Sequence, residues 1–270
     1  MKRKKHDIQI KRLFKPMGWI FFLSVLYNIF YIYGSVFLGG WAVLGYAFLI
    51  LLGMASSVGF YWICTRIWQK PFSFEIPTIL PILIIEGVVL VFTFGLLLPL
   101  HEIVYENDIW YLSLIYQIVC ALLVVLVQPL QLCMFTGLAQ NMTKPKELLS
   151  YVKNRFLHSF KDVWNRYCLI LLMIIFLDSL IGAPFSMASG FDGYSILTNI
   201  LVFGNPMLSW MLAFFMAAGV GLNSSAIVYI FILFLTGILY MIVECNFLVK
   251  VGTTWIDYGT EKSKTHKKKK

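Results

Sequence analysis

The amino-acid sequence predicts an all-α integral membrane protein, a bundle of six transmembrane helices with both termini in the cytoplasm. The first observation is composition: 60% of the 270 residues are hydrophobic, 13% are charged, and the mean hydropathy is +0.80. A soluble domain has about 25% charged residues, so this chain has too few charges to cover a surface in water. Its high hydrophobicity also excludes an intrinsically disordered protein.

The second observation is the number of long apolar stretches. A helix needs about 20 apolar residues to cross a hydrocarbon core ~30 Å thick, because each residue adds ~1.5 Å. Six stretches have this length, and we expect spans at residues 17–38, 40–64, 76–100, 110–137, 166–188 and 226–249. A seventh stretch, 196–222, is interrupted by polar residues and proline. We expect it to form a short re-entrant or interfacial helix on the outer side.

The third observation is the distribution of positive charge. With six spans and the N-terminus inside, all 22 Lys and Arg residues lie on the cytoplasmic side. The outer loops then carry acidic residues but no Lys or Arg. Positively charged cytoplasmic loops orient membrane proteins, so the pattern predicts this topology. The chain divides into a basic N-terminal segment (1–16), a membrane domain (17–250) and a polybasic cytoplasmic tail (251–270).

Two acidic residues fall near the middle of predicted spans, Glu86 in 76–100 and Asp178 in 166–188. A charge at that depth costs ~2.5–3.5 kcal/mol, and no Lys or Arg occupies the middle of any predicted span. We therefore expect both side chains to face the protein interior and to be protonated, bound to a cation, or hydrogen-bonded. Their candidate partners within the spans include Asn28, Gln117, Gln128 and Gln131. A proton or cation relay is one interpretation, and neutral acids that join helices by hydrogen bonds are the other.

The loop after the third predicted span concentrates possible metal ligands. They are His101, Glu102, Glu106 and Asp108. Imidazole and carboxylate groups together can hold a divalent cation, but we favour a solvated acidic loop and expect no metal or other cofactor. The sequence has no H-E-x-x-H, G-x-S-x-G or phosphate-binding glycine motif. We therefore expect no enzymatic activity.

The connector between the fourth and fifth predicted spans contains an amphipathic helix at residues 146–164. Its apolar residues recur every three or four positions and so share one helical face. That face includes Leu148, Val152, Phe156, Phe160 and Trp164, and the basic residues include Lys153, Arg155 and Lys161. This pattern predicts adhesion to anionic lipids of the inner leaflet. The alternative is docking of a soluble partner such as an ATPase subunit.

For function, the sequence favours a transporter or permease component. Glu86, Asp178, prolines within the fourth and fifth predicted spans, and the 196–222 element support this interpretation. The alternative is a non-enzymatic scaffold, assembly, immunity or accessory protein, because the loops are short and no functional motif is present.

The expected partners are the bilayer, its anionic inner-leaflet lipids, and a soluble ATPase or a second membrane subunit. The polybasic tail is attracted to anionic lipid, and nothing predicts nucleic-acid binding. We expect a multi-pass protein of a bacterial plasma membrane. In a eukaryotic cell the terminal lysines would match a dilysine retrieval pattern of the endoplasmic reticulum membrane.

Overall fold

The computed structural model describes residues 42–97, 99–100, 103–104, 110–158 and 245–256. It also describes Lys15, Gly18, Trp19, Phe22, Val25, Leu26, Ile29 and Phe30. The regular structure of these parts is helical, without a β-strand among them, which confirms the all-α prediction for this portion. The predicted span at 166–188, the 196–222 element and most of the predicted span at 226–249 lie outside the described residues.

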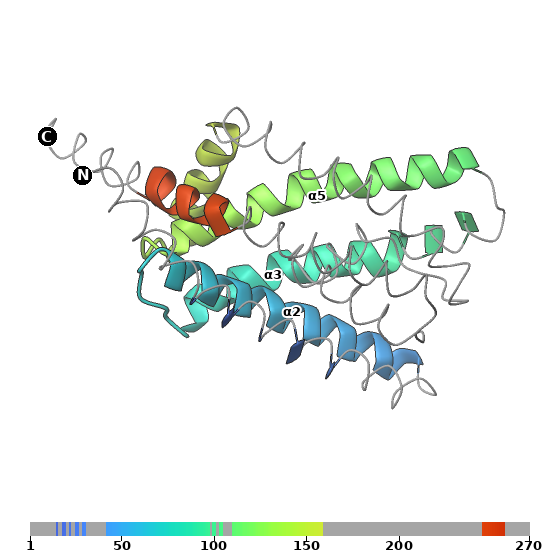
Figure 1. Ribbon diagram of the computed structural model, residues 1–270, viewed down its shortest axis with the longest axis horizontal. Helices are drawn as coiled ribbons and strands as arrows, with labels where there is room; N and C mark the ends of the chain where they lie inside the picture. Colours follow the sequence, from blue (N-terminus) through green and yellow to red (C-terminus); the bar gives the residue numbers. More distant parts are fainter. Residues whose placement is uncertain are drawn as a thin grey trace, which may run out of the picture.

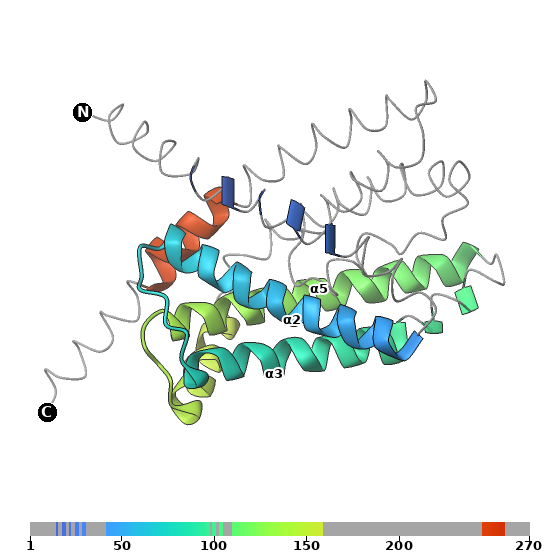
Figure 2. The same cartoon turned by 90° about the horizontal axis from the view of Figure 1, so that it is seen from below.

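Three long helices lie side by side (Figure 1): α2 (Ala42–Ile67), α3 (Ile76–Phe92) and α5 (Trp110–Leu138). A π-helical turn, η1 (Thr93–Leu97), continues α3. α3 packs against both α2 and α5. Residues 145–158 form another helix, and residues 245–251 lead into a second π-helical turn, η2 (Gly252–Ile256). Both lie at the same end of the bundle as the end of α5, a placement that Figure 2 also shows.

Two of the described helical segments, Ile50–Ile67 and Ile76–Leu97, are long and apolar enough to cross a membrane. A third apolar segment, Leu126–Leu138, is shorter. Their outward faces are apolar too: Leu51 is 66% exposed and Val88 is 65% exposed. Exposed apolar side chains along long helices are suited to contact with lipid, which agrees with a membrane protein.

The ends of α2 and α5 share one type of cap. Gln69 and Asn141 have left-handed backbones, with φ of 57° and 62°. The amide of Lys70 then donates to the Thr65 carbonyl at 2.9 Å, and the amide of Met142 donates to the Gly137 carbonyl at 3.2 Å. These bonds satisfy carbonyls that the helix itself leaves open, and they reverse the chain sharply.

The core lies at the end of the bundle where these two caps are found. It is aromatic: the Phe135 ring lies 5.2 Å from the Tyr61 ring and 6.0 Å from the Phe60 ring. Trp68 and Trp255 extend the same cluster of buried residues. α2, α5, residues 145–158 and residues 245–256 are thereby joined at one end.

Candidate functional site

The carboxyl group of Glu86 is enclosed between α2, α3 and α5. Its side chain is 0% exposed. One oxygen, Oε2, accepts a hydrogen bond from Ser57 Oγ of α2 at 2.9 Å and another from Gln131 Nε2 of α5 at 2.8 Å. The second oxygen, Oε1, is buried and has no hydrogen-bond partner among the described residues. We call these three side chains the Glu86 triad.

The Glu86 triad lies far from the ends of its helices. Glu86 comes ten residues after Ile76, and Ser57 comes ten residues before Ile67, so each is ~15 Å along its helix from that end. Gln131 is ~10 Å from the end of α5 by the same rise. The distances for Glu86 and Ser57 equal about half of a ~30 Å hydrocarbon core, and the distance for Gln131 about one third.

Local sequence explains why Glu86 faces inward. The buried residues of α3 are Thr78, Ile82, Glu86 and Leu90. They repeat every four positions and therefore line one helix face, the face turned towards the other helices. Glu86 occupies a core position of that face.

Small residues let α2 and α3 approach each other beside the Glu86 triad. A Cβ on Gly87 would lie 3.0 Å from the Met54 Cε atom of α2, so a larger residue would push against that side chain. Gly53, Ser56 and Ser57 are buried on α2. Small residues commonly occupy close contacts between membrane helices, and here they bring Ser57 within reach of Glu86.

Gln131 reaches Glu86 from a helix that contains proline. Pro129 has no amide hydrogen, so it leaves the carbonyl four residues earlier without its usual helical bond. The glutamines on either side of Pro129, Gln128 and Gln131, are both buried. Gln131 uses its amide to join α5 to α3.

No basic residue of the three helices lies at the depth of Glu86. α3 and α5 contain no Lys or Arg, and the single one in α2, Arg66, is next to its last residue. Among the described residues, the salt bridge present joins Lys144 and Glu147 on an exposed surface at 3.4 Å. The triad therefore contains a buried carboxyl group whose Oε2 accepts two hydrogen bonds and whose Oε1 accepts none from the described residues, an arrangement suited to hold a proton or a small cation.

A second polar cluster ties residues 145–158 to the end of α5. The Tyr151 hydroxyl donates to Thr136 Oγ1 at 3.2 Å and accepts from Gln140 Nε2 at 3.1 Å. Burial raises the pKa of this hydroxyl above its ordinary value, although both hydrogen bonds act in the opposite direction. The Arg155 guanidinium lies over the Trp255 ring, 5.0 Å from its centre.

Trp68 makes the corresponding link from the end of α2. Its ring nitrogen Nε1 donates to the Leu248 carbonyl at 2.7 Å. The ring lies against Gly252 so closely that an added Cβ would overlap it. The segments at this end of the molecule are therefore tightly packed against one another, and the hydrogen bonds of Tyr151 and Trp68 join them.

The predicted amphipathic helix contributes to this packing. Leu148 and Val152 are buried in the core, Phe156 packs against it, and Arg155 is buried while Lys153 is exposed. Over residues 145–158, Leu148, Val152 and Phe156 of the predicted apolar face thus contact protein. The same predicted face also includes Leu149, which is instead 72% exposed, as Leu157 is at 63%. Phe160, Lys161 and Trp164 lie outside the described residues.

Of the predicted intramembrane polar residues, the structure brings Glu86 and Gln131 together. Asp178 and Asn28 lie outside the described residues, as does the side chain of Gln117. The predicted metal ligands His101, Glu102, Glu106 and Asp108 lie outside them as well. Within the described part of the chain, no group of three or more His, Cys, Asp or Glu side chains could hold a metal ion.

Sequence reasoning missed Ser57, the third member of the triad. The sequence feature that could have found it is the Ser56–Ser57 pair within an apolar stretch predicted to cross the membrane.

Comparison of the chain with protein-family models, with curated proteins and with solved structures gives no match.

Proposed function

We propose that the protein is a transporter or permease component in which Glu86 carries a proton along the path through the membrane. The observation that supports this most strongly is the position of the Glu86 carboxyl. It is wholly buried at about half the length of a spanning helix, and only one of its oxygens accepts hydrogen bonds. Ionisable groups at such depth commonly mark ion pathways and proton relays.

The proposal includes six spans with both termini inside, in a bacterial plasma membrane. The complete separation of Lys and Arg from the outer loops supports it, as do the three helices found at predicted spans. Single cysteines introduced into a cysteine-free chain test the topology. Positions 150 and 264 should react only with reagent from the inside and position 106 only from the outside; the reverse at any of them contradicts the topology.

A second candidate is a non-transporting scaffold, assembly or immunity protein. The observation that favours it is that both hydrogen bonds to Glu86 cross between helices, as they would for an acid whose role is structural. Under this alternative Glu86 joins α2, α3 and α5 but exchanges no proton during function.

Proton flux into reconstituted vesicles separates the two candidates. Wild-type protein, Glu86→Gln and Glu86→Leu are placed in vesicles that contain a pH-sensitive dye, and a membrane potential drives proton entry. Glu75→Gln is the matched control, because it makes the same substitution at an exposed position before α3. Thermal unfolding of each variant is measured in parallel.

The transport proposal predicts proton entry in wild type and Glu75→Gln, and its loss in Glu86→Gln at unchanged thermal stability. Glu86→Leu should lose both flux and stability, because it also removes the interhelical hydrogen bonds. Equal flux in wild type and Glu86→Gln, or no flux above empty vesicles in the wild type, contradicts the transport proposal and favours the scaffold.

A further inference from the structure

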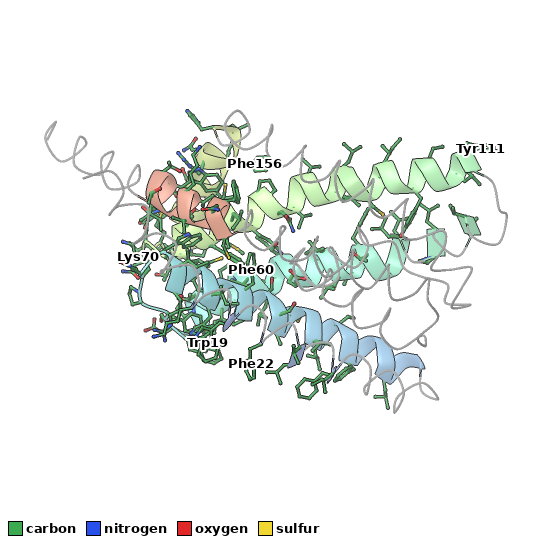
Figure 3. All side chains as sticks on the ribbon, in the orientation of Figure 1. Trp19, Phe22, Phe60, Lys70, Tyr111 and Phe156 are labelled. Atoms are coloured by element: carbon green, nitrogen blue, oxygen red, sulfur yellow. The ribbon has the colours of Figure 1, made fainter. Side chains whose placement is uncertain are left out.

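A groove lies on the surface of the bundle beside α2. It has a volume of about 510 Å³ and is lined by Lys15, Gly18, Trp19 and Phe22. In Figure 3, Trp19 and Phe22 lie along one side of α2, with Trp19 nearer the end that carries Lys70. The groove is open, since Trp19 is 46% exposed and Phe22 is 51% exposed.

α2 adds a second basic residue close to this groove. The Trp19 ring meets the Trp62 ring edge to face, with 5.2 Å between their centres. The Arg66 guanidinium lies 5.4 Å from the centre of the same Trp62 ring. Both Lys15 and Arg66 are exposed. Lys15 therefore lines the groove itself, and Arg66 is joined to its lining through Trp62 and Trp19.

The chemistry of the groove changes in a regular way along the helix axis. Gly18, Trp19 and Phe22 follow Lys15 by three, four and seven residues, the spacing of one helix face. Lys15 and Phe22 are separated by ~10 Å of helix rise. A cation comes first, then an amphipathic ring suited to the headgroup level, then a purely apolar ring. A phospholipid has the same order: phosphate, glycerol ester and acyl chain.

We propose that this groove binds one anionic phospholipid, with its phosphate beside Lys15 and Arg66 and an acyl chain along Trp19 and Phe22. The two exposed cations complement the net charge of an anionic headgroup, whereas a free phosphate would leave the exposed aromatic surface uncovered. The six-span topology places this lipid in the cytoplasmic leaflet. The test below measures lipid affinity, so it is independent of any transport activity.

Binding of phosphatidylglycerol to the purified, delipidated full-length protein tests the proposal. Native mass spectrometry measures the affinity of the first lipid bound, and phosphatidylcholine with the same acyl chains is the comparison. The test variant is Lys15→Gln with Arg66→Gln. The matched control, Lys70→Gln with Lys250→Gln, removes two positive charges outside the groove.

The groove variant should bind the first phosphatidylglycerol roughly 25-fold more weakly, about fivefold for each cation removed. The control pair should change this affinity less than about twofold, and wild type should prefer phosphatidylglycerol over phosphatidylcholine. Equal loss in both variants would assign the binding to net charge alone. Equal affinity for the two lipids would show that the groove binds acyl chains without recognising the charge of the headgroup. Either result overturns the proposal.

Two further measurements locate the lipid and exclude a soluble anion. Phosphatidylglycerol brominated on its acyl chain should quench tryptophan fluorescence in the wild type, and Trp19→Phe should remove part of that quenching. Glycerol phosphate in excess should not displace the lipid. Unchanged quenching in Trp19→Phe places the lipid elsewhere, and displacement by glycerol phosphate makes the site an anion site; both results contradict the proposal.

Discussion

The two donors to Glu86 share a single carboxyl oxygen, and removing them one at a time and together tests the Glu86 triad. Ser57→Ala removes the bond from α2, and Gln131→Leu removes the bond from α5 while keeping a side chain of similar size. The control is Thr65→Val, because Thr65 is also buried in α2 but its hydroxyl donates to the Trp62 carbonyl of its own helix at 2.7 Å.

The magnitudes follow from the arrangement of these bonds. A side-chain hydrogen bond between membrane helices contributes on average ~0.6 kcal/mol and at most ~1.7 kcal/mol. Ser57→Ala and Gln131→Leu should each lower the free energy of unfolding by about this amount. The double variant leaves the buried Glu86 without either donor, so its loss should exceed the sum of the single losses by ~0.5 kcal/mol or more. Thr65→Val should cost less than either single substitution, because its bond joins no second helix.

Unfolding by sodium dodecyl sulfate in mixed micelles measures these free energies in the full chain. The double-mutant cycle gives the coupling between Ser57 and Gln131 directly. Additive losses, or a loss for Ser57→Ala no larger than that for Thr65→Val, would show that the Glu86 triad does not bind the three helices together. The reasoning from the shared oxygen would then be refuted.

Two further predictions concern the backbone and packing at the ends of the helices. Gly252→Ala should destabilise the protein by ~1–3 kcal/mol, because the new Cβ overlaps the Trp68 ring, whereas Gly95→Ala should be neutral or stabilising because its Cβ meets nothing within 4 Å. Thermal unfolding of both variants checks this, and equal effects would contradict the packing at Gly252. Gln69→Gly should raise the free energy of unfolding by about 0.5–1 kcal/mol by relieving a left-handed backbone, and Asn141→Gly should change it less, because asparagine tolerates that conformation better. A larger gain at Asn141 than at Gln69 in the same assay would contradict this account of the caps.

Length and hydropathy were sufficient to place the described helices. α2, α3 with η1, and α5 cover most of the predicted stretches 40–64, 76–100 and 110–137. Their ends differ by a few residues because the caps at Gln69 and Asn141 depend on backbone geometry that hydropathy does not report. Helix formation within an apolar stretch is a local property, which explains why sequence could predict it.

The Glu86 site was only partly predictable. A buried acid needs a polar partner at the same depth, and this requirement placed Gln131 among several candidates without choosing between them. The structure shows that Gln131 is the one that donates to Glu86. The sequence analysis did not predict Ser57, because its contact with Glu86 depends on how α2 is rotated against α3, and that rotation is set by packing. Periodicity likewise predicted the apolar face of residues 145–158 but not what covers it. Leu148 and Val152 contact protein there.

Charge movement after a rapid pH change tests the central claim, that Glu86 exchanges a proton within the membrane, most directly. Vesicles that contain wild-type protein, Glu86→Gln or Glu75→Gln are adsorbed on a solid-supported membrane, and the transient current after the pH step is recorded. The account predicts similar currents for wild type and Glu75→Gln and no current above empty vesicles for Glu86→Gln. Equal currents in all three proteins, or no current in the wild type, would contradict it.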